Sequence, residues 1–124
     1  MMQSLLNHTR RPDITFHRSG RIDITAAVVT ALGIKPGDVI DITTEGREYY
    51  LHVRHRATEL VGRHQLQCQP TNPRSRNMRT HSVQLCSIIL QLTGSNQQAH
   101  VMAGQPVSHP DLHATVLPLI IPKQ

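Results

Sequence analysis

Three arginines close together in the second half of the chain are the residues best suited to chemistry, and that chemistry is the binding of an anion. Arg74, Arg76 and Arg79 occupy a proline-containing segment, 70–77, and the start of a helix that apolar spacing predicts over about 79–92. A guanidinium presents a planar fork of N–H groups that matches phosphate, and the free backbone amides at a helix start also attract anions. The pattern predicts a phosphate-binding loop. The alternative is an exposed linker whose arginines are only solvated.

The charge of the whole chain favours an anionic partner as well. Its 124 residues include 13 Lys and Arg, of which 11 are Arg, against 8 Asp and Glu, and the net charge is +5. No acidic residue occurs between Leu60 and Pro110, so the arginines of that run have no ion-pair partner nearby in the sequence. A polyanion suits such a composition. Because Phe16, Tyr49 and Tyr50 are the only aromatics, duplex DNA held through its phosphates fits better than a single strand, which needs stacking platforms.

Histidines and cysteines offer a second kind of site. His64, Cys68, His81 and Cys86 make a set of two imidazoles and two thiols, which is a possible zinc donor set. His81 and Cys86, however, are five residues apart, and in a helix that spacing places them on different sides. We therefore predict two buried, reduced cysteines and no metal site.

No arrangement of residues predicts catalysis. The sequence has no glycine-rich phosphate loop, no nucleophile elbow and no useful pair of carboxylates. A nucleophilic Cys–His pair is disfavoured because both cysteines fall within apolar patterns, where a thiol is inert. We expect no enzymatic activity and no cofactor. We also expect no secretory or membrane-spanning segment, and a cytoplasmic location.

Two further arginines, Arg18 and Arg21, lie earlier in the chain, and the elements that would position them fall within residues 14–42. Ile22 and Ile24 alternate with polar residues, which predicts a half-buried strand. Thr25 stands where its hydroxyl can cap a helix, and Gly33 stands where that helix can end in a left-handed residue. Strand, turn, strand, short helix and strand fit into about thirty residues, a unit too small to bury a core alone. The unit therefore predicts a second copy, and hence an intertwined dimer.

Residues 14–54 resemble the AbrB/MazE family of swapped-hairpin transcription factors and antitoxins. The matching positions are Gly20-Arg21-Ile22-Asp23-Ile24-Thr25, Leu32-Gly33-Ile34 and Gly37-Asp38-Val39-Ile40. The resemblance implies a β-barrel made from the hairpins of two chains, and DNA contact through Arg18 and Arg21. Thr25 replaces the proline usual in the family, and the helix 26–32 has no basic residue.

The second half of the chain carries no such resemblance, and no internal repeat is visible between the halves. Its patterns predict a strand over 61–69, the loop 70–77, the helix 79–92, and strands over 98–102 and 112–121. We therefore predict a mostly β fold with short helices in three parts. These are an N-terminal arm (1–13), a swapped-hairpin dimeric barrel domain (14–56) and a small α+β module (57–124).

Together these patterns predict a dimeric DNA-binding transcriptional regulator. The residues expected to hold the duplex are Arg18, Arg21, Arg74, Arg76 and Arg79. The alternative is an antitoxin-like or scaffold protein, in which the barrel only makes a homodimer or larger homo-oligomer and the C-terminal module binds a protein partner. Salt-sensitive binding to duplex DNA separates the two functions.

Overall fold

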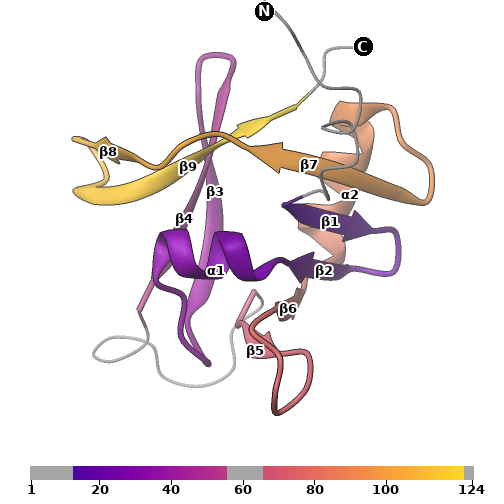
Figure 1. Cartoon of the computed structure of the whole chain (residues 1–124). Coiled ribbons are helices and arrows are strands. Elements are labelled where there is room, and N and C mark those ends of the chain that lie inside the picture. Colours follow the sequence, from indigo (N-terminus) through magenta and orange to yellow (C-terminus); the bar gives the residue numbers. More distant parts are fainter. Residues whose placement is uncertain (1–12, 56–65, 122–124) are drawn as a thin grey trace, which may run out of the picture.

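The computed structural model describes residues 13–55 and 66–121 and shows a mostly β protein with two short helices, as predicted (Figure 1). In chain order the elements are β1 (Ile14–His17), β2 (Arg21–Ile24), α1 (Ala26–Leu32), β3 (Val39–Glu45), β4 (Glu48–Arg54), β5 (Gln69–Pro70), β6 (Met78–His81), α2 (Val83–Thr93), β7 (Gln98–Ala103), β8 (Val107–His109) and β9 (Ala114–Ile120). Within the described ranges, neither helix has the length and apolar character needed to cross a membrane.

The strands form one antiparallel sheet that curls into a half-barrel. Its order is β3–β4–β9–β7–β1–β2–β6–β5, and β8 pairs with β9. The two ends of this order meet, because Val39 of β3 bridges Gln67 just before β5. Next to the bridge, Cys68 N donates to Asp38 O at 2.7 Å. The sheet therefore bends round far enough to enclose a core.

The core is built from alternate residues of the strands. Ile14, Phe16, Ile22 and Ile24 are at most 1% exposed, as the alternation of the sequence predicts. The C-terminal half contributes Cys68, Met78, Cys86, Ile89, Leu90, Val101, Leu117 and Leu119 to the same cluster. Burying one large apolar side chain stabilises the fold by about 1.5–3 kcal/mol, so both halves contribute to one shared core.

The two predicted domains also share the sheet. β7 pairs with β1, with Phe16 opposite Ala99, and β9 pairs with β4. Strands from 57–124 thus lie between the hairpins formed by 14–56. This differs from the expected barrel domain followed by a separate module. The physical reason is that β7 and β9 pair with the free edges of the β1–β2 and β3–β4 hairpins and add their inward side chains to the same core.

The chain passes twice through the same order of elements. β1–β2–α1–β3 is followed by β5–β6–α2–β7. Each helix follows a hydroxyl residue, Thr25 or Ser82, and ends at a left-handed glycine, Gly33 with φ 64° or Gly94 with φ 67°. β2 and β6 pair antiparallel where the two units meet, which is the pairing that an approximate two-fold axis produces. A unit with this order of elements thus occurs a second time in the same chain, although the side chains show no repeat.

Helix α1 begins at the predicted place but with a different cap. The Thr25 hydroxyl donates to Asp13 O at 3.1 Å and caps no helix amide. The amide of Ala26 donates instead to Asn77 Oδ1 at 2.8 Å. A side chain 51 residues away in the sequence therefore caps the helix. The end of the helix at Gly33 is as predicted.

The helix predicted over 79–92 begins later, at Val83. Residues 78–81 form β6 instead, because their backbone groups pair with β2. Ser82 then caps α2, since its side-chain oxygen accepts from Leu85 N at 3.1 Å. The start of this helix was therefore predicted four residues too early.

The remaining predicted strands are partly described. The strand expected over 98–102 is β7, and that expected over 112–121 is β9, with β8 as an additional short partner. Of the strand expected over 61–69, residues 61–65 lie outside the described part, as do residues 1–12 of the N-terminal arm.

Candidate anion-binding face

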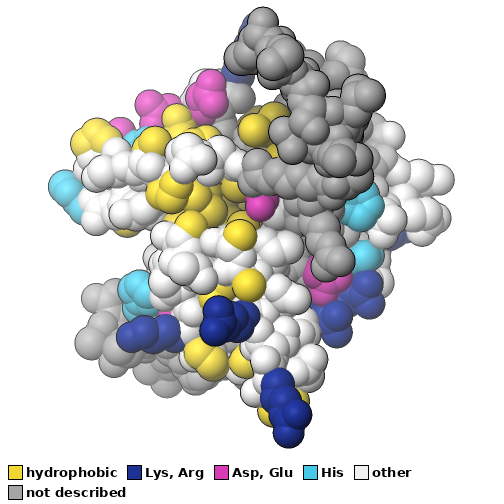
Figure 2. All heavy atoms as spheres, viewed as in Figure 1, with side chains coloured by type: hydrophobic (Ala, Val, Ile, Leu, Met, Phe, Trp, Pro, Cys, Tyr) yellow, Lys and Arg dark blue, Asp and Glu magenta, His cyan; other side chains and the backbone are white. Residues whose placement is uncertain are grey.

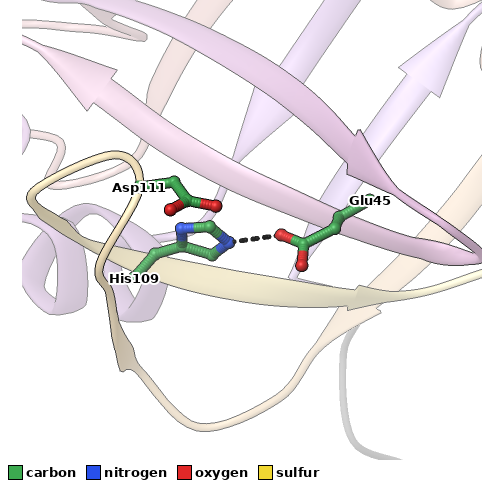
Figure 3. Close-up of side chains that lie close together, drawn as sticks. All are labelled: Glu45, His109 and Asp111. Carbon is green, nitrogen blue, oxygen red and sulfur yellow. Dashed lines mark hydrogen bonds and ion pairs between the residues drawn. The ribbon is translucent and has the colours of Figure 1, made fainter.

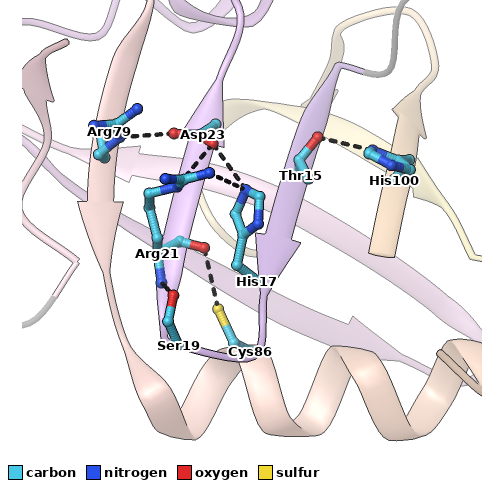
Figure 4. Close-up of polar contacts among 8 residues, drawn as sticks. All are labelled: Thr15, His17, Ser19, Arg21, Asp23, Arg79, Cys86 and His100. Atoms are coloured by element: carbon cyan, nitrogen blue, oxygen red, sulfur yellow. Dashed lines mark hydrogen bonds and ion pairs between the residues drawn. The ribbon is translucent and has the colours of Figure 1, made fainter. Parts of the chain in front are cut away.

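Arg21, Asp23 and Arg79 form an ion-pair cluster on the outer face of the sheet (Figure 4). Arg79 Nε donates to Asp23 Oδ1 at 2.8 Å, and Arg21 Nε lies 3.2 Å from Asp23 Oδ2. Both arginine side chains are 47% exposed, and that of Asp23 is 32% exposed. One carboxylate thus faces two guanidiniums, and the cluster keeps a net positive charge towards solvent.

Buried and exposed residues alternate along β2 and β6, and this alternation positions the cluster. On β2, Ile22 and Ile24 are buried, so Arg21 and Asp23 lie on the outer face. β6 alternates in the same way and exposes Arg79. The antiparallel register places Asp23 directly opposite Arg79, and opposite charges at such positions attract across the strands.

His17 of β1 completes the cluster. Its Nε2 lies 2.9 Å from Asp23 Oδ2 and 3.2 Å from Arg21 Nη2. A ring nitrogen either carries a proton or has a free lone pair, so it donates to Asp23 or accepts from Arg21, not both at once. Partial burial raises the pKa of Asp23, but hydrogen bonds from Arg79 and His17 and the charges of both arginines outweigh it and hold that pKa below its ordinary value. Asp23 is therefore ionised at neutral pH.

Two adjoining hollows lie on either side of Arg79, and we call them together the Arg79 groove. The larger, of about 480 Å³, is lined by β2, β6 and the segment 67–71. The smaller, of about 240 Å³, is lined by β2, the start of β6 and Asn77. Thr71 and Arg79 border both hollows. The lining of the larger hollow includes Arg21, Gln67, Gln69, Arg79, Thr80 and His81, of which Thr80 has its side chain on the inner face of the sheet.

Of the five arginines predicted to bind DNA, the structure brings two together, Arg21 and Arg79. Arg18 is exposed in the turn between β1 and β2, and Arg74 and Arg76 are exposed in the loop between β5 and β6. The predicted position of these loop arginines at a helix start is wrong, because β6 separates them from α2.

The five arginines are instead distributed along β2 and β6 and just beyond the ends of these two strands. Arg18 precedes β2, at the end where β6 finishes, and Arg74 and Arg76 precede β6, at the end where β2 finishes. Arg21 and Arg79 lie between these two ends. The five arginines therefore follow β2 and β6 in backbone position, although the Arg18 side chain turns to Asn96 Oδ1, 3.5 Å away and beyond α2.

Charge is distributed unevenly over the molecule. In the view of Figure 2, Lys and Arg side chains gather over the lower half, where β2, β5 and β6 lie, and acidic side chains gather at the far end of the β3–β4 hairpin. Glu45 and Glu48 belong to that hairpin, and Asp13 and Asp38 are buried. The carboxylate of Asp23 is the acidic group that lies within the arginine cluster itself.

The cysteines are buried and free, as predicted. Burial and the nearby Asp38 carboxylate raise the pKa of Cys68 to about 12. Burial also raises the pKa of Cys86, against a smaller opposing effect of a backbone hydrogen bond. Of the zinc set considered from the sequence, His64 lies outside the described residues and His81 is exposed on β6. Neither thiol is in an environment that favours a nucleophilic thiolate.

A second polar cluster, which the sequence did not predict, joins the β3–β4 hairpin to the turn after β8 (Figure 3). Glu45, His109 and Asp111 each place one possible ligand atom within 4.8 Å of the others. His109 Nε2 lies 2.7 Å from Glu45 Oε2, and its ring packs edge-on against Tyr50 with centroids 5.2 Å apart. An imidazole and two carboxylates suit a divalent cation, but Glu45 is 62% exposed, and the contact also fastens the two hairpins without an ion. No local signal predicts it, because Glu45 and His109 are 64 residues apart.

Fold and site together define a small protein with a curled β-sheet and an arginine-rich outer face. Comparison of the chain with protein-family models, with curated proteins and with solved structures finds no match. The function therefore has to follow from the chemistry of the site.

Proposed function

We propose that this chain binds duplex DNA through the face that carries Arg21 and Arg79, as an AbrB/MazE-like transcriptional regulator. The observation that carries the proposal is the placement of these two guanidiniums. They come from different hairpins and lie half exposed on neighbouring strands, on either side of Asp23. Basic side chains that neutralise phosphates supply most of the sequence-independent affinity for a duplex.

The other three arginines extend this face in both directions. Arg18 lies beyond one end of β2, and Arg74 and Arg76 lie beyond the other. At about 3.3 Å per residue, a four-residue strand spans roughly 13 Å, so the positions of the five arginines together span enough length to meet several phosphates of one backbone. Contacts of this kind set the position of the protein on DNA, and sequence preference then arises from the shape of the duplex.

The resemblance over residues 14–54 supports the regulator class. β1–β2–α1–β3–β4 is the order of elements that the resemblance implies. The homodimer that it also implies was inferred because one such unit is too small to bury a core. In this chain the second unit, β5–β6–α2–β7, contributes to the same core. We therefore propose that a single chain forms the DNA-binding particle without exchanging hairpins with a second chain.

The decisive experiment measures binding of a labelled random-sequence duplex at about 50 mM and about 200 mM salt. Arg21→Ala/Arg79→Ala is the test variant. Arg47→Ala is the matched control, because Arg47 is exposed in the turn between β3 and β4, at the acidic end of the molecule.

We expect the unmodified chain to lose affinity steeply with salt, with a log–log slope of about −0.9 for each phosphate contact. The double variant should bind at least about tenfold more weakly and with a shallower slope, whereas Arg47→Ala should bind as the unmodified chain does. Negligible binding by the unmodified chain, or equal losses in both variants, would exclude this face as the DNA-binding surface.

A protein-binding role is the second candidate, and exposed apolar side chains on α2 favour it. Val83 and Ile88 are 56% and 48% exposed. Val83 also borders a hollow of about 320 Å³ that Arg18 and Leu90 line as well. Val83 is thus an exposed apolar group next to a hollow, and Ile88 adds a second one on another side of the helix. A stoichiometric partner that is lost on Val83→Ser/Ile88→Ser, together with no salt-sensitive DNA binding, would favour this role.

A further inference from the structure

We propose that the larger hollow of the Arg79 groove binds a nucleoside phosphate. The inference rests on the proposed function in one respect, because both use Arg21 and Arg79. It goes further by assigning one pocket to one phosphate and the nucleoside that carries it. The hollow measures about 480 Å³. That volume lies within the range of roughly 300–1,000 Å³ found for small-molecule sites.

Arg79 has hydrogen-bond donors to offer this hollow. A guanidinium carries five N–H donors. The Nε–H of Arg79 donates to Asp23 Oδ1. The two Nη groups of Arg79 make no hydrogen bond within the described part of the chain. Figure 4 shows the guanidinium beside the Asp23 carboxylate, joined to it by a single hydrogen bond. Two adjacent Nη groups form the fork that pairs with phosphate oxygens.

Asp23 holds this fork in place before any ligand arrives. Its Oδ1 lies 2.8 Å from Arg79 Nε, and its Oδ2 lies 3.2 Å from Arg21 Nε. Both arginines also line the larger hollow. Groups that are already oriented lose less conformational entropy on binding, so one carboxylate prepares two cations for the same anion.

Two more polar groups at the hollow are unpaired. Thr80 Oγ1 and Gln67 Nε2 are buried atoms without a hydrogen-bond partner among the described residues. Thr80 is only 4% exposed, and both residues line the hollow. Buried polar groups are paired in the great majority of cases, because an unmade hydrogen bond leaves their desolvation uncompensated. The Gln67 amide would gain an acceptor if its side chain turned toward a phosphate in the hollow, whereas the Thr80 hydroxyl lies on the inner face of β6 with Met78.

The rest of the lining suits a nucleoside better than a bare anion. Gln69 and His81 border the same hollow. A glutamine amide donates and accepts at once, as the edge of a nucleobase does. An inorganic phosphate ion would leave most of the volume empty. The donor groups and the size of the hollow together point to a phosphate that carries a nucleoside.

A phosphate that carries a nucleoside can belong to a DNA strand or to a free nucleotide. The experiment distinguishes these two sources. The probes are adenosine monophosphate, adenosine and inorganic phosphate, each titrated calorimetrically into the full chain. A second arm adds saturating adenosine monophosphate to the complex with labelled duplex. Displacement of the duplex assigns the hollow to a nucleotide of DNA, and simultaneous binding assigns it to a free nucleotide; either result supports the pocket.

We expect saturable binding of adenosine monophosphate, at least about tenfold tighter than binding of adenosine or of phosphate. Gln67→Ala and Arg79→Gln should each weaken it about tenfold or more. Gln67→Ala leaves the Asp23–Arg79 pair intact, so its effect does not depend on that pair. Gln105→Ala is the matched control, since Gln105 is exposed between β7 and β8, and it should bind as the unmodified chain does.

No saturable binding of adenosine monophosphate, or equal losses in Gln67→Ala and Gln105→Ala, would overturn the inference. Its failure is distinct from failure of the proposed function. Nucleotide binding without salt-sensitive duplex binding would support the pocket and remove the DNA-binding proposal. Salt-sensitive duplex binding without nucleotide binding would support the DNA-binding proposal and remove the pocket.

Discussion

Asp23 of β2 and Arg79 of β6 lie directly opposite each other in neighbouring strands, and a hydrogen bond of 2.8 Å joins their side chains. The two residues are 56 positions apart in the sequence. At 32% and 47% exposure, such a pair stabilises a fold by only about 0–1 kcal/mol. Its main effect is on position, because it holds a cation at a defined place on the surface and lowers the net charge there by one.

Replacing Asp23 with Asn is therefore expected to tighten binding to duplex DNA. The substitution removes the negative charge within the arginine cluster and keeps a side-chain oxygen that can accept from Arg79. At about 50 mM salt we expect affinity to rise several-fold and the log–log salt slope to steepen by up to about one. Glu48→Gln removes the same charge from the acidic hairpin as a control. An equal gain in that variant would show that only net charge matters.

Acid is expected to weaken the fold partly through Asp23. The pKa of Asp23 in the folded chain lies below its ordinary value of 3.8, so the folded state favours the ionised form more than the unfolded chain does. The resulting stabilisation is complete above about pH 5 and is lost as the pH falls below 4 through the folded-state pKa. For a partly exposed group it amounts to less than about 1 kcal/mol. Urea unfolding at pH 6 and pH 3 should show a steeper loss for the unmodified chain than for Asp23→Asn, and parallel losses would contradict this.

The thiol of Cys68 is expected to resist alkylation until the chain unfolds. A pKa of about 12 lowers the thiolate fraction at pH 8 by about three orders of magnitude relative to an ordinary thiol, and burial blocks access as well. The measurement is the rate of iodoacetamide labelling of Cys86→Ser, with and without urea. Labelling of the folded chain at the rate of a small thiol would mean that Cys68 is accessible.

The chain without DNA is expected to be monomeric. C-terminal strands of the same chain pair with the edges of β1–β2 and β3–β4 and fill the same core, so no second chain is needed to complete that core. Light scattering coupled to size exclusion should give 13.9 kDa. A mass of twice that value at micromolar concentration would favour the dimer that the sequence predicts.

Gly20→Ala is expected to destabilise the fold more than Gly46→Ala. Both glycines have positive φ, 100° and 61°, so both substitutions strain the backbone. A Cβ at Gly20 would also lie 2.7 Å from His81 Nε2 and 2.8 Å from Val83 Cγ2, whereas one at Gly46 would meet nothing within 4 Å. The additional clash should cost about 1–3 kcal/mol, measured as the difference in free energy of unfolding in urea. Equal losses would mean that the turn before β2 adapts.

Elements that depend on neighbours in the sequence were predictable. Alternation around Ile22 and Ile24 predicts their burial, and Leu32-Gly33 predicts the helix end, because side-chain period and backbone freedom are local properties. The apolar surroundings of Cys68 and Cys86 likewise predict two buried thiols. Each of these expectations is confirmed.

Contacts between distant segments were not predictable. Apolar spacing is helical from Leu85 onwards, but the residues just before it join the sheet because β2 offers them backbone hydrogen bonds. The cap of α1 comes from Asn77 and not from Thr25, and Glu45 meets His109, for the same reason. In each case the partner is supplied by a segment at least 50 residues away, and no local pattern encodes it.

The amino-acid sequence alone was enough to predict a mostly β chain with an arginine excess, its first hairpin and its first helix. No local pattern shows that Arg21 and Arg79 share one carboxylate, that Arg18, Arg74 and Arg76 remain apart from it, or that the second half completes the core of the first; these features follow from the folded arrangement of the strands. The physical reason is that strand pairing joins backbone groups irrespective of their distance along the chain. Register, more than composition, therefore determines which charges meet.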